Sequence, residues 1–287
     1  MNKHVGELIA VDTCPVELYG AEYYASHCGP FPYERSAHWL QFFAKTADEL
    51  IRAIRPTCVF DAGCAHGFLV EAFWDRGVEA YGRDISSFTI SRVRPDLRPY
   101  CEVGSISDPL PDHYDLVTCI EVLEHMPEKL ALRAIRSMTA ATTRIFFSSS
   151  PDDFDEPTHV NVRPPIYWLR RFAEAGFAPV PGFDGSFLCH QAMLLEHRDG
   201  PIDEQLLLGQ AEIIRLRLEI LQRHRSQLEF QHELNRNPFF IPVRVANRVA
   251  KIFRNCADRQ TGWSSAKRQL GRLVPALGRR ELIIDRH

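Results

Sequence analysis

The sequence predicts an α/β fold in which a doubly wound, mostly parallel sheet is followed by a C-terminal helical appendage. Between residues 34 and 199, short apolar runs alternate with segments of helical periodicity, which is typical of a parallel sheet with helices on both faces. After residue 200 the strand pattern ends and a long helical pattern begins. The composition of the 287 residues, 45% hydrophobic and 25% charged, excludes collagen-like, disordered and disulfide-scaffold proteins.

The first expected element is a helix from Arg35 to Ile54, because its apolar residues recur on one face and Pro56 ends it. Five apolar runs are then expected as strands, at residues 57–60, 79–82, 100–103, 115–120 and 144–148. The segments between them predict helices at 68–76, shortly after 86, and at 128–139. One more helix, from Pro165 to Ala175, is expected to precede two last strands near 177–182 and 187–197.

Charge divides the chain more finely. Residues 1–235 carry a net charge of −12, whereas residues 236–287 carry +9. We therefore expect an aromatic-rich N-terminal lid (1–33), an α/β domain (34–199), a long helix (200–236) and a basic amphipathic tail (237–287). The eight cysteines include no CxxC pair, which indicates reduced structural thiols, and we expect no metal site.

The first functional motif is the turn after the first strand, where residues 59–69 are VFDAGCAHGFL. Gly63 and Gly67 let a ligand approach the backbone at the start of a helix. A dinucleotide-binding turn requires GxGxxG, but here Asp61 stands in place of the first glycine. Its carboxylate repels a pyrophosphate and favours a ligand with an ammonium or sulfonium group. Asp61 could instead cap the next helix, although a cap does not explain both glycines.

Acidic side chains also follow two other strands. Asp84 ends the second strand about 20 residues beyond the glycine turn, where a carboxylate binds the ribose hydroxyls of an adenosine; capping of the following helix is the alternative. Glu121, Glu124 and His125 follow the fourth strand, at the sheet edge where open α/β folds bind ligands. The motifs together predict a site for a nucleoside with a positively charged tail.

In the order and spacing of these motifs, residues 34–197 resemble a class I S-adenosylmethionine-dependent methyltransferase. The resemblance implies a Rossmann-like sheet of seven strands with an antiparallel last hairpin, and S-adenosylmethionine as the cofactor. Gly63 and Gly67 would face the methionine portion of the cofactor, and Glu121 would lie near that end. Asp84 would face the ribose. The cofactor-binding residues are thus expected to be Asp61, Gly63, Cys64, Gly67, Asp84, Ser105, Ile106 and Glu121.

Two positions depart from the pattern of that family. Many members have glycine where this chain has Ala65, and many have aspartate where it has Ser105, the residue that with Ile106 would contact the adenine. The first difference narrows the turn slightly. The second puts that adenine contact in doubt, but neither removes the cofactor site.

Catalysis needs mainly alignment of the acceptor with the methyl group, and a hydroxyl acceptor also benefits from a general base. Histidine supplies one near neutral pH. The candidates are His159, in the polar loop after the fifth strand, which we favour, and His125. His159 could instead hold the loop by a hydrogen bond. Tyr23 and its neighbours in the N-terminal lid fit aromatic packing better than substrate contact.

The leading interpretation is therefore an enzyme that methylates an oxygen of a sugar, a lipid-linked glycan or another small acceptor. Its rival is a catalytically silent methyltransferase-like scaffold that binds partners through the C-terminal helix and tail. A dehydrogenase is disfavoured because GxGxxG is missing. Methyltransferase domains with such appendages also resemble those of bacterial surface-polysaccharide pathways.

The C-terminal segments suggest partners but leave alternatives open. Leucine or isoleucine recurs every seven residues within 203–235, which fits either a helix docked on the domain or a homodimer zipper. The basic amphipathic segment 237–254 suits an anionic membrane surface, and packing on the acidic domain is the alternative. Nucleic acid is disfavoured because no recognition fold accompanies the charge. Without an apolar spanning run or a signal-peptide pattern, we expect a cytoplasmic protein, with the inner membrane face as one location.

Overall fold

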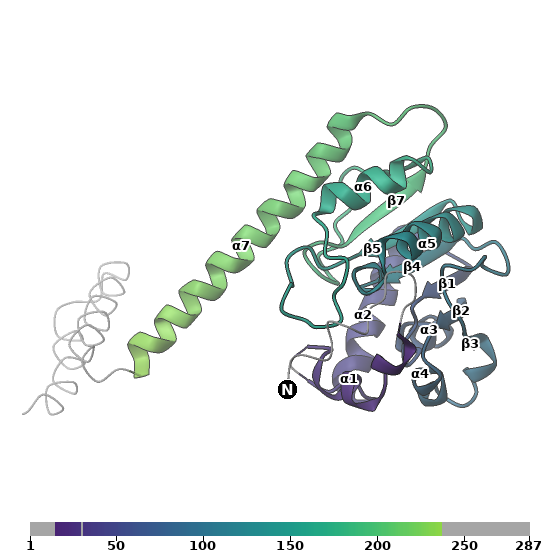
Figure 1. Cartoon of the computed structure of the whole chain (residues 1–287), viewed down its shortest axis with the longest axis horizontal. Coiled ribbons are helices and arrows are strands. Elements are labelled where there is room, and N and C mark those ends of the chain that lie inside the picture. Colours follow the sequence, from purple (N-terminus) through teal and green to yellow (C-terminus); the bar gives the residue numbers. More distant parts are fainter. Residues whose placement is uncertain (1–14, 30, 237–287) are drawn as a thin grey trace, which may run out of the picture. The chain divides into compact units, whose positions relative to one another are not determined.

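The computed structural model describes residues 15–29 and 31–236. The chain divides after Glu219 into two units, which are described separately. Within the first unit, the described residues form one sheet from β1 (Cys58–Ala62), β2 (Glu79–Asp84), β3 (Cys101–Val103), β4 (Leu116–Ile120), β5 (Arg144–Ser148), β6 (Phe177–Pro179) and β7 (Met193–His197) (Figure 1).

The strand order is β3-β2-β1-β4-β5-β7-β6. The first five strands are parallel, whereas β7 pairs antiparallel with both β5 and β6. This arrangement confirms the predicted seven-stranded, mostly parallel sheet with an antiparallel last hairpin.

The last hairpin differs from the prediction in its bounds. β6 ends at Pro179 and β7 begins only at Met193, so the predicted strand at 187–197 is wrong for its first half. Phe187, Leu188 and Cys189 form a loop and are partly buried against the hydrophobic core. Their apolar character therefore reflects packing of the loop, which periodicity alone cannot distinguish from a strand.

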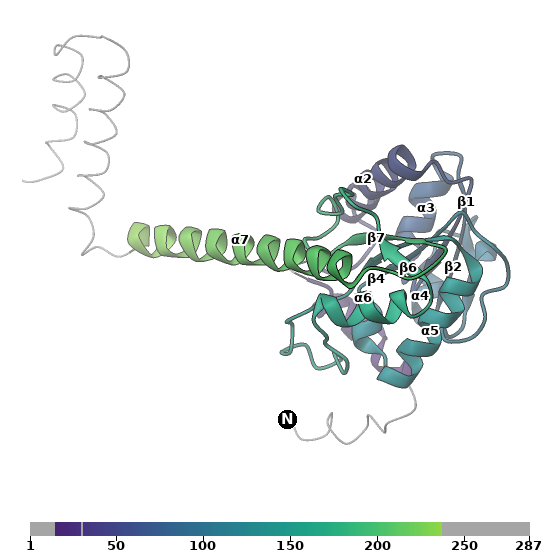
Figure 2. The same cartoon turned by 90° about the horizontal axis from the view of Figure 1, so that it is seen from above.

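Helices cover both faces of the sheet (Figure 2). Side chains of α2 (Ala37–Ile54), α3 (Phe68–Trp74) and α4 (Ser87–Arg92) share one buried cluster with Val59, Leu116 and Phe146 of the strands. The other face packs against α5 (Glu128–Ala141), α6 (Pro165–Ala173) and the first turns of α7 (Glu204–Arg236).

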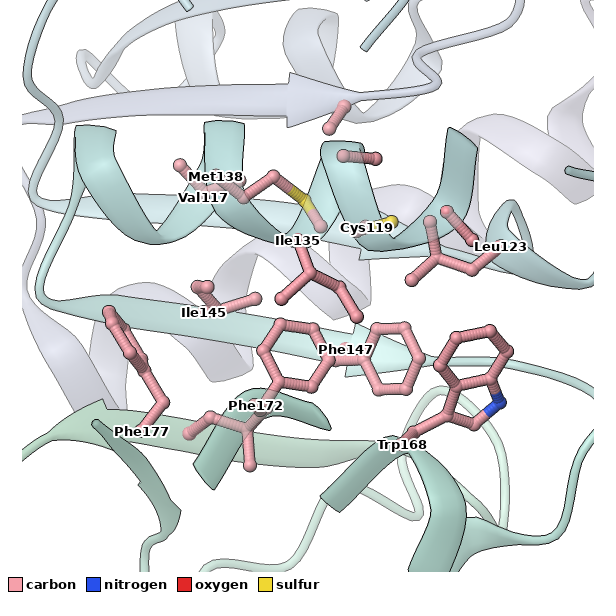
Figure 3. Close-up of a cluster of buried hydrophobic side chains, with 14 of the residues drawn as sticks. Val117, Cys119, Leu123, Ile135, Met138, Ile145, Phe147, Trp168, Phe172 and Phe177 are labelled. Atoms are coloured by element: carbon pink, nitrogen blue, oxygen red, sulfur yellow. The ribbon is translucent and has the colours of Figure 1, made fainter. Parts of the chain in front are cut away.

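Alternation along the strands explains why the sheet has two cores. In β5, Phe146 faces the first cluster, while Ile145 and Phe147 face the second. Figure 3 shows this second cluster, in which Phe147 lies close to Trp168 and Phe172 of α6. Because strands buried on both faces are apolar throughout, the runs seen in the sequence are continuous rather than alternating.

The N-terminal segment contains η1 (Val16–Leu18) and α1 (Ala21–Ser26). It is attached near the start of α4, where the Ser86 hydroxyl donates to the Tyr19 carbonyl oxygen at 2.6 Å. Tyr24 is buried, and its ring lies 4.9 Å from that of His66 in the glycine turn. Aromatic packing thus fixes this segment beside the turn.

The first half of α7 docks on the domain. Leu207 and Ile214 are 2% and 0% exposed and belong to the same core as α5 and α6. Leu207 and Ile214 are two of the four leucine and isoleucine residues that recur every seven residues, so half of this repeat is used for docking. A homodimer through 203–235 stays a prediction for the other half of the repeat. Among the described residues, no helix is both long and apolar enough to cross a membrane. The amphipathic segment 237–254 lies outside the described residues.

Candidate active site

A cavity of about 390 Å³ lies at the carboxyl ends of β1, β2 and β4. The strand order reverses between β1 and β4, and open α/β sheets bind ligands at such a switch point. The cavity is bounded on its other sides by the N-terminal segment and α2, by the loop after β5, and by the loop before β7. All of the predicted cofactor-binding and catalytic residues except Gly67 line it.

The glycine turn is clamped onto the second strand. The backbone N–H groups of Gly63 and Cys64 both donate to the Arg83 carbonyl oxygen, at 2.8 and 3.1 Å. Gly63 and Cys64 line the cavity. Gly67 does not line it; this residue takes φ +70° and forms the N-cap of α3. The structure thus gives Gly67 a role in shaping the turn, and its contact with the ligand stays a prediction.

Ala65 also has a left-handed backbone, with φ +46°. Glycine adopts this conformation without steric cost, whereas alanine pays a penalty. The difference from the family pattern therefore concerns backbone strain more than the width of the turn. The Ala65 N–H donates to Asp84 Oδ2 at 2.9 Å, which holds the strained residue in place.

Replacement of Gly63 by alanine is expected to destabilise the fold strongly. Gly63 has φ +87°, and a Cβ atom at this position would collide with the side chain of Val122. The left-handed backbone costs about 1–2 kcal/mol, and the collision adds about 1–3 kcal/mol. Urea unfolding measures the sum.

The matched control is Gly77→Ala. Gly77 has a similar φ, +75°, but nothing lies within 4 Å of its added Cβ. Only the backbone penalty, about 1–2 kcal/mol, is expected there. Equal losses in the two variants would show that the contact with Val122 does not restrict position 63.

Asp61 lies at the end of β1 and lines the cavity, with 6% of its surface exposed. Its carboxylate accepts a hydrogen bond from the Thr118 hydroxyl at 2.6 Å. Burial, with a smaller contribution from the nearby Asp84, raises the pKa of Asp61 to about 7 despite the lowering effect of the Thr118 hydrogen bond. Because Gly67 caps α3, capping does not explain Asp61. A buried carboxyl group of this kind is stabilised as the anion by a cationic ligand.

Asp84, at the end of β2, both lines the cavity and organises the protein around it. Its Oδ1 accepts from the Ser86 N–H at 2.9 Å and the Thr89 hydroxyl at 3.2 Å, at the start of α4. Its Oδ2 accepts from Ala65 of the glycine turn. The N-cap of α4 is Ser86, whose hydroxyl accepts from the Thr89 N–H, so Asp84 supports the start of the helix without capping it. Burial raises the pKa of Asp84 despite these hydrogen bonds.

Ser105 and Ile106 follow β3 and both line the cavity. The Ser105 hydroxyl lies 2.8 Å from that of Ser107 and also accepts from the Ser107 N–H. Ile106 is buried and presents an apolar side chain. These positions fit the edge of a flat aromatic ring, and the adenine contact stays a prediction.

Glu121 follows β4 in a strained conformation. Its φ is +52°, a left-handed value that non-glycine residues rarely adopt and that often marks functional sites. Its Oε1 accepts from the Gln191 amide at 3.1 Å, and both Glu121 and Cys189 line the cavity. The hydrogen bond and the backbone fix the carboxylate at the cavity wall.

The two predicted histidines lie together, although they are far apart in the sequence. The ring centroids of His125 and His159 are 4.5 Å apart, and both residues line the cavity. Nδ1 of His159 donates to the Asp153 carbonyl oxygen at 2.7 Å. Burial lowers the pKa of His125 to about 4, and the adjacent His159 lowers it too. His125 is therefore neutral near pH 7.

The expected lid residues lie at the cavity. Tyr19, Tyr23 and Tyr24 line it, and the Tyr23 hydroxyl lies 3.4 Å from Nε2 of His125. Burial raises the pKa of Tyr23 well above its usual range, so this hydroxyl stays protonated. His66 of the glycine turn does not line this cavity and lies in a neighbouring depression beside Phe88.

Some wall residues could not be found from the sequence. Cys189 lies in the loop that was predicted as a strand, and Ser150 is one of three serines in a polar loop. Gln191, in the same loop as Cys189, does not line the cavity but donates to Glu121. Their roles depend on where these loops fold back over the sheet. No local pattern in the sequence marks that position.

Comparison with known proteins extends the observations. A family model described as a methyltransferase domain matches residues 33–181. Ubiquinone biosynthesis O-methyltransferase of Idiomarina loihiensis is 32% identical over 100 residues, which cover 32% of this chain and 41% of that protein. The enzyme of the same name from Nitrosomonas europaea is 30% identical over 112 residues, or 36% and 47% of the two chains. The chain spans less than half the length of these curated relatives.

Among solved structures, magnesium protoporphyrin IX methyltransferase from Synechocystis PCC 6803, crystallised with bound S-adenosylmethionine, is similar with a TM-score of 0.46. The sequences are 18% identical, and the match covers 61% of this chain and 93% of that one. A mitomycin 7-O-methyltransferase structure has a TM-score of 0.41 at 16% identity, with 56% and 53% covered.

Proposed function

This chain belongs to the methyltransferase domain family, and from that membership we propose that it transfers a methyl group from S-adenosylmethionine to a hydroxyl oxygen of a small acceptor. The observation that carries the proposal is one cavity that joins Asp61, Gly63 and Asp84 to a pair of imidazoles. Asp61, Gly63 and Asp84 suit the cofactor, and the two imidazoles suit an acceptor that loses a proton.

The residues of the cavity fit the cofactor chemically. Asp61 and Asp84 are two buried carboxyl groups with raised pKa values, and an ammonium or sulfonium group would offset the cost of ionising them. Asp84 is positioned to accept from ribose hydroxyls, and Ile106 offers an apolar surface to the adenine. Gly63 lines the cavity, and its missing side chain leaves room for Val122 beside the turn.

The chain's own residues then have three tasks. They bind the cofactor, exclude water from its reactive end, and remove the proton of the acceptor. S-adenosylmethionine supplies a methyl group that is already activated by the sulfonium charge, so alignment can provide most of the rate enhancement. His159, with Nδ1 donating to Asp153, presents Nε2 as a proton acceptor, and His125 beside it is neutral.

The acceptor belongs to the same proposal. The curated relatives are named as O-methyltransferases of ubiquinone biosynthesis, which supports an oxygen acceptor here. We favour a hydroxyl on a sugar, a lipid-linked glycan or a similar small molecule. Contact of residues 237–254 with an anionic membrane surface would bring a lipid-linked acceptor close, and that contact stays a prediction.

Calorimetric titration with S-adenosylhomocysteine, the expected product, tests the proposal without knowledge of the acceptor. We expect binding at one site per chain with a micromolar dissociation constant. Absence of binding would contradict the proposal and would favour the silent scaffold, whose partners would then be sought through the C-terminal helix.

The affinity for S-adenosylhomocysteine is expected to weaken as the pH falls below about 7. The pKa of Asp61 is about 7 in the free protein, and the ammonium group of the ligand favours the carboxylate form. Below this pKa, binding must displace a proton, so affinity falls toward about tenfold per pH unit. Above pH 7 it should be nearly constant. Calorimetry between pH 5.5 and 8 measures the profile, and Asp61→Asn should bind weakly with no step near pH 7.

A further inference from the structure

Three side chains with metal-binding groups meet at the edge of the cavity. Glu124 and His125 lie in η3 (Leu123–His125), directly after β4, and His159 lies in the loop after β5. One ligand atom from each of them lies within 4.8 Å of the others. Both histidines also line the cavity. A cation held here would therefore be accessible to a ligand in the cavity.

The hydrogen bond of His159 determines which ring nitrogen carries the lone pair. Nδ1 lies 2.7 Å from the carbonyl oxygen of Asp153. Because a carbonyl oxygen only accepts, Nδ1 carries the hydrogen. In the neutral ring Nε2 then has the lone pair that a metal requires.

His125 has the same tautomer for a similar reason. The Thr158 hydroxyl donates to the Glu156 carboxylate at 3.0 Å, so its oxygen accepts from Nδ1 of His125, also at 3.0 Å. Nε2 of His125 is again the acceptor, and the Tyr23 hydroxyl approaches it only at 3.4 Å. Histidines that bind metals usually have such an outer hydrogen bond at the other ring nitrogen.

Glu124 supplies an independent observation. Its side chain is 0% exposed, and while Oε1 accepts from the Ser150 N–H at 2.9 Å, Oε2 is buried without a hydrogen-bond partner among the described residues. A buried carboxylate oxygen without a hydrogen-bond partner is costly, and a cation bound at this oxygen would remove that cost.

We propose that Glu124, His125 and His159 bind one divalent cation of the first transition series, with Glu121 as an additional carboxylate close by. Two imidazole nitrogens and a carboxylate oxygen suit Mn²⁺, Fe²⁺, Co²⁺ or Zn²⁺. Mg²⁺ and Ca²⁺ prefer oxygen ligands throughout. Three protein ligands leave positions open for a ligand from the cavity. The prediction of no metal site was based only on patterns within short segments of the sequence, which do not show that these three residues meet.

This inference rests on the proposed function and names how the acceptor is activated. A hydroxyl group that reaches the cation becomes more acidic, and its O–H bond breaks with the proton passing to water. The oxygen then forms a bond to the methyl carbon, while the bond from that carbon to sulfur breaks and leaves its electron pair on sulfur. In this arrangement His159 holds the cation and does not act as the base.

Manganese binding to the full-length protein tests the site directly. Mn²⁺ is the probe because the free cysteines of the described chain would also bind Zn²⁺. After removal of metals with a chelator, Mn²⁺ is titrated and the electron paramagnetic resonance signal of the free ion is followed. We expect one ion bound per chain, with at least tenfold weaker binding in His159→Asn and in Glu124→Gln. The exposed His113 provides the control, because His113→Asn should bind as the wild type does.

S-adenosylhomocysteine binding by the same metal-free samples separates the two proposals. Binding of this ligand shows that a variant is folded. This control matters for Glu124→Gln, because Glu124 is fully buried. His159 borders the cavity, so His159→Asn still tests the site if Glu124→Gln does not fold. The cation site is overturned if the wild type binds the product but no Mn²⁺ at millimolar concentration, or if both variants bind Mn²⁺ normally. Failure of the wild type to bind the product contradicts the proposed function instead.

Discussion

Asp84→Ala is expected to weaken S-adenosylhomocysteine binding about 100-fold. In the proposed complex the Asp84 carboxylate accepts hydrogen bonds from both ribose hydroxyls. Charge-assisted hydrogen bonds are worth about 1.5–3 kcal/mol each. A 100-fold loss of affinity corresponds to about 2.7 kcal/mol of binding free energy. Isothermal calorimetry measures the change. The structure also indicates an effect on the fold.

Asp84 also accepts hydrogen bonds from Ala65, Ser86 and Thr89. Its removal leaves these donors without their partner, which should lower the free energy of unfolding by about 1–3 kcal/mol. Urea unfolding measured beside calorimetry separates this loss from the loss of binding. Glu79→Ala, at the exposed start of the same strand, is the control and should change neither quantity strongly. Unchanged affinity in a folded Asp84→Ala protein would remove this residue from the site.

His159→Ala is expected to reduce turnover by about 10²–10⁴-fold, the range for loss of a general base, while product affinity stays within a few-fold of wild type. The imidazole lines the cavity beside His125, on the side of the proposed acceptor and away from Asp84. Formation of S-adenosylhomocysteine with a panel of sugar and phenolic hydroxyl acceptors measures turnover. His113→Ala is again the control.

The loss of turnover does not depend on whether His159 removes the proton itself or holds a cation. The two cases differ in their response to metal. A chelator should leave the wild-type rate unchanged if the imidazole is the base, and should abolish it if a cation activates the acceptor. Full activity of His159→Ala would exclude both roles.

Much of the fold followed from local patterns. The runs that became β1, β4 and β5 are apolar because their side chains are buried on both faces of the sheet. Some helix ends could be predicted from single residues. Pro56 follows the end of α2, where Arg55 has a left-handed conformation, and Gly77 lies just beyond the end of α3. The loop before β7 was assigned wrongly because partly buried Phe187 and Leu188 have the composition of a strand.

Because strand patterns and strand ends are local properties, the sequence predicted the parallel sheet and the acidic residues at its carboxyl edge. It also placed Asp61, Gly63 and Asp84 at the predicted cofactor site, since each lies at or directly after the end of a strand. That Glu124, His125 and His159 lie within ligand distance of one another is visible only in the folded chain. That contact depends on how the loop after β5 folds back over η3, where Val160 and Asn161 donate to the Glu124 carbonyl oxygen, and such a closure between distant segments leaves no periodic trace in the sequence.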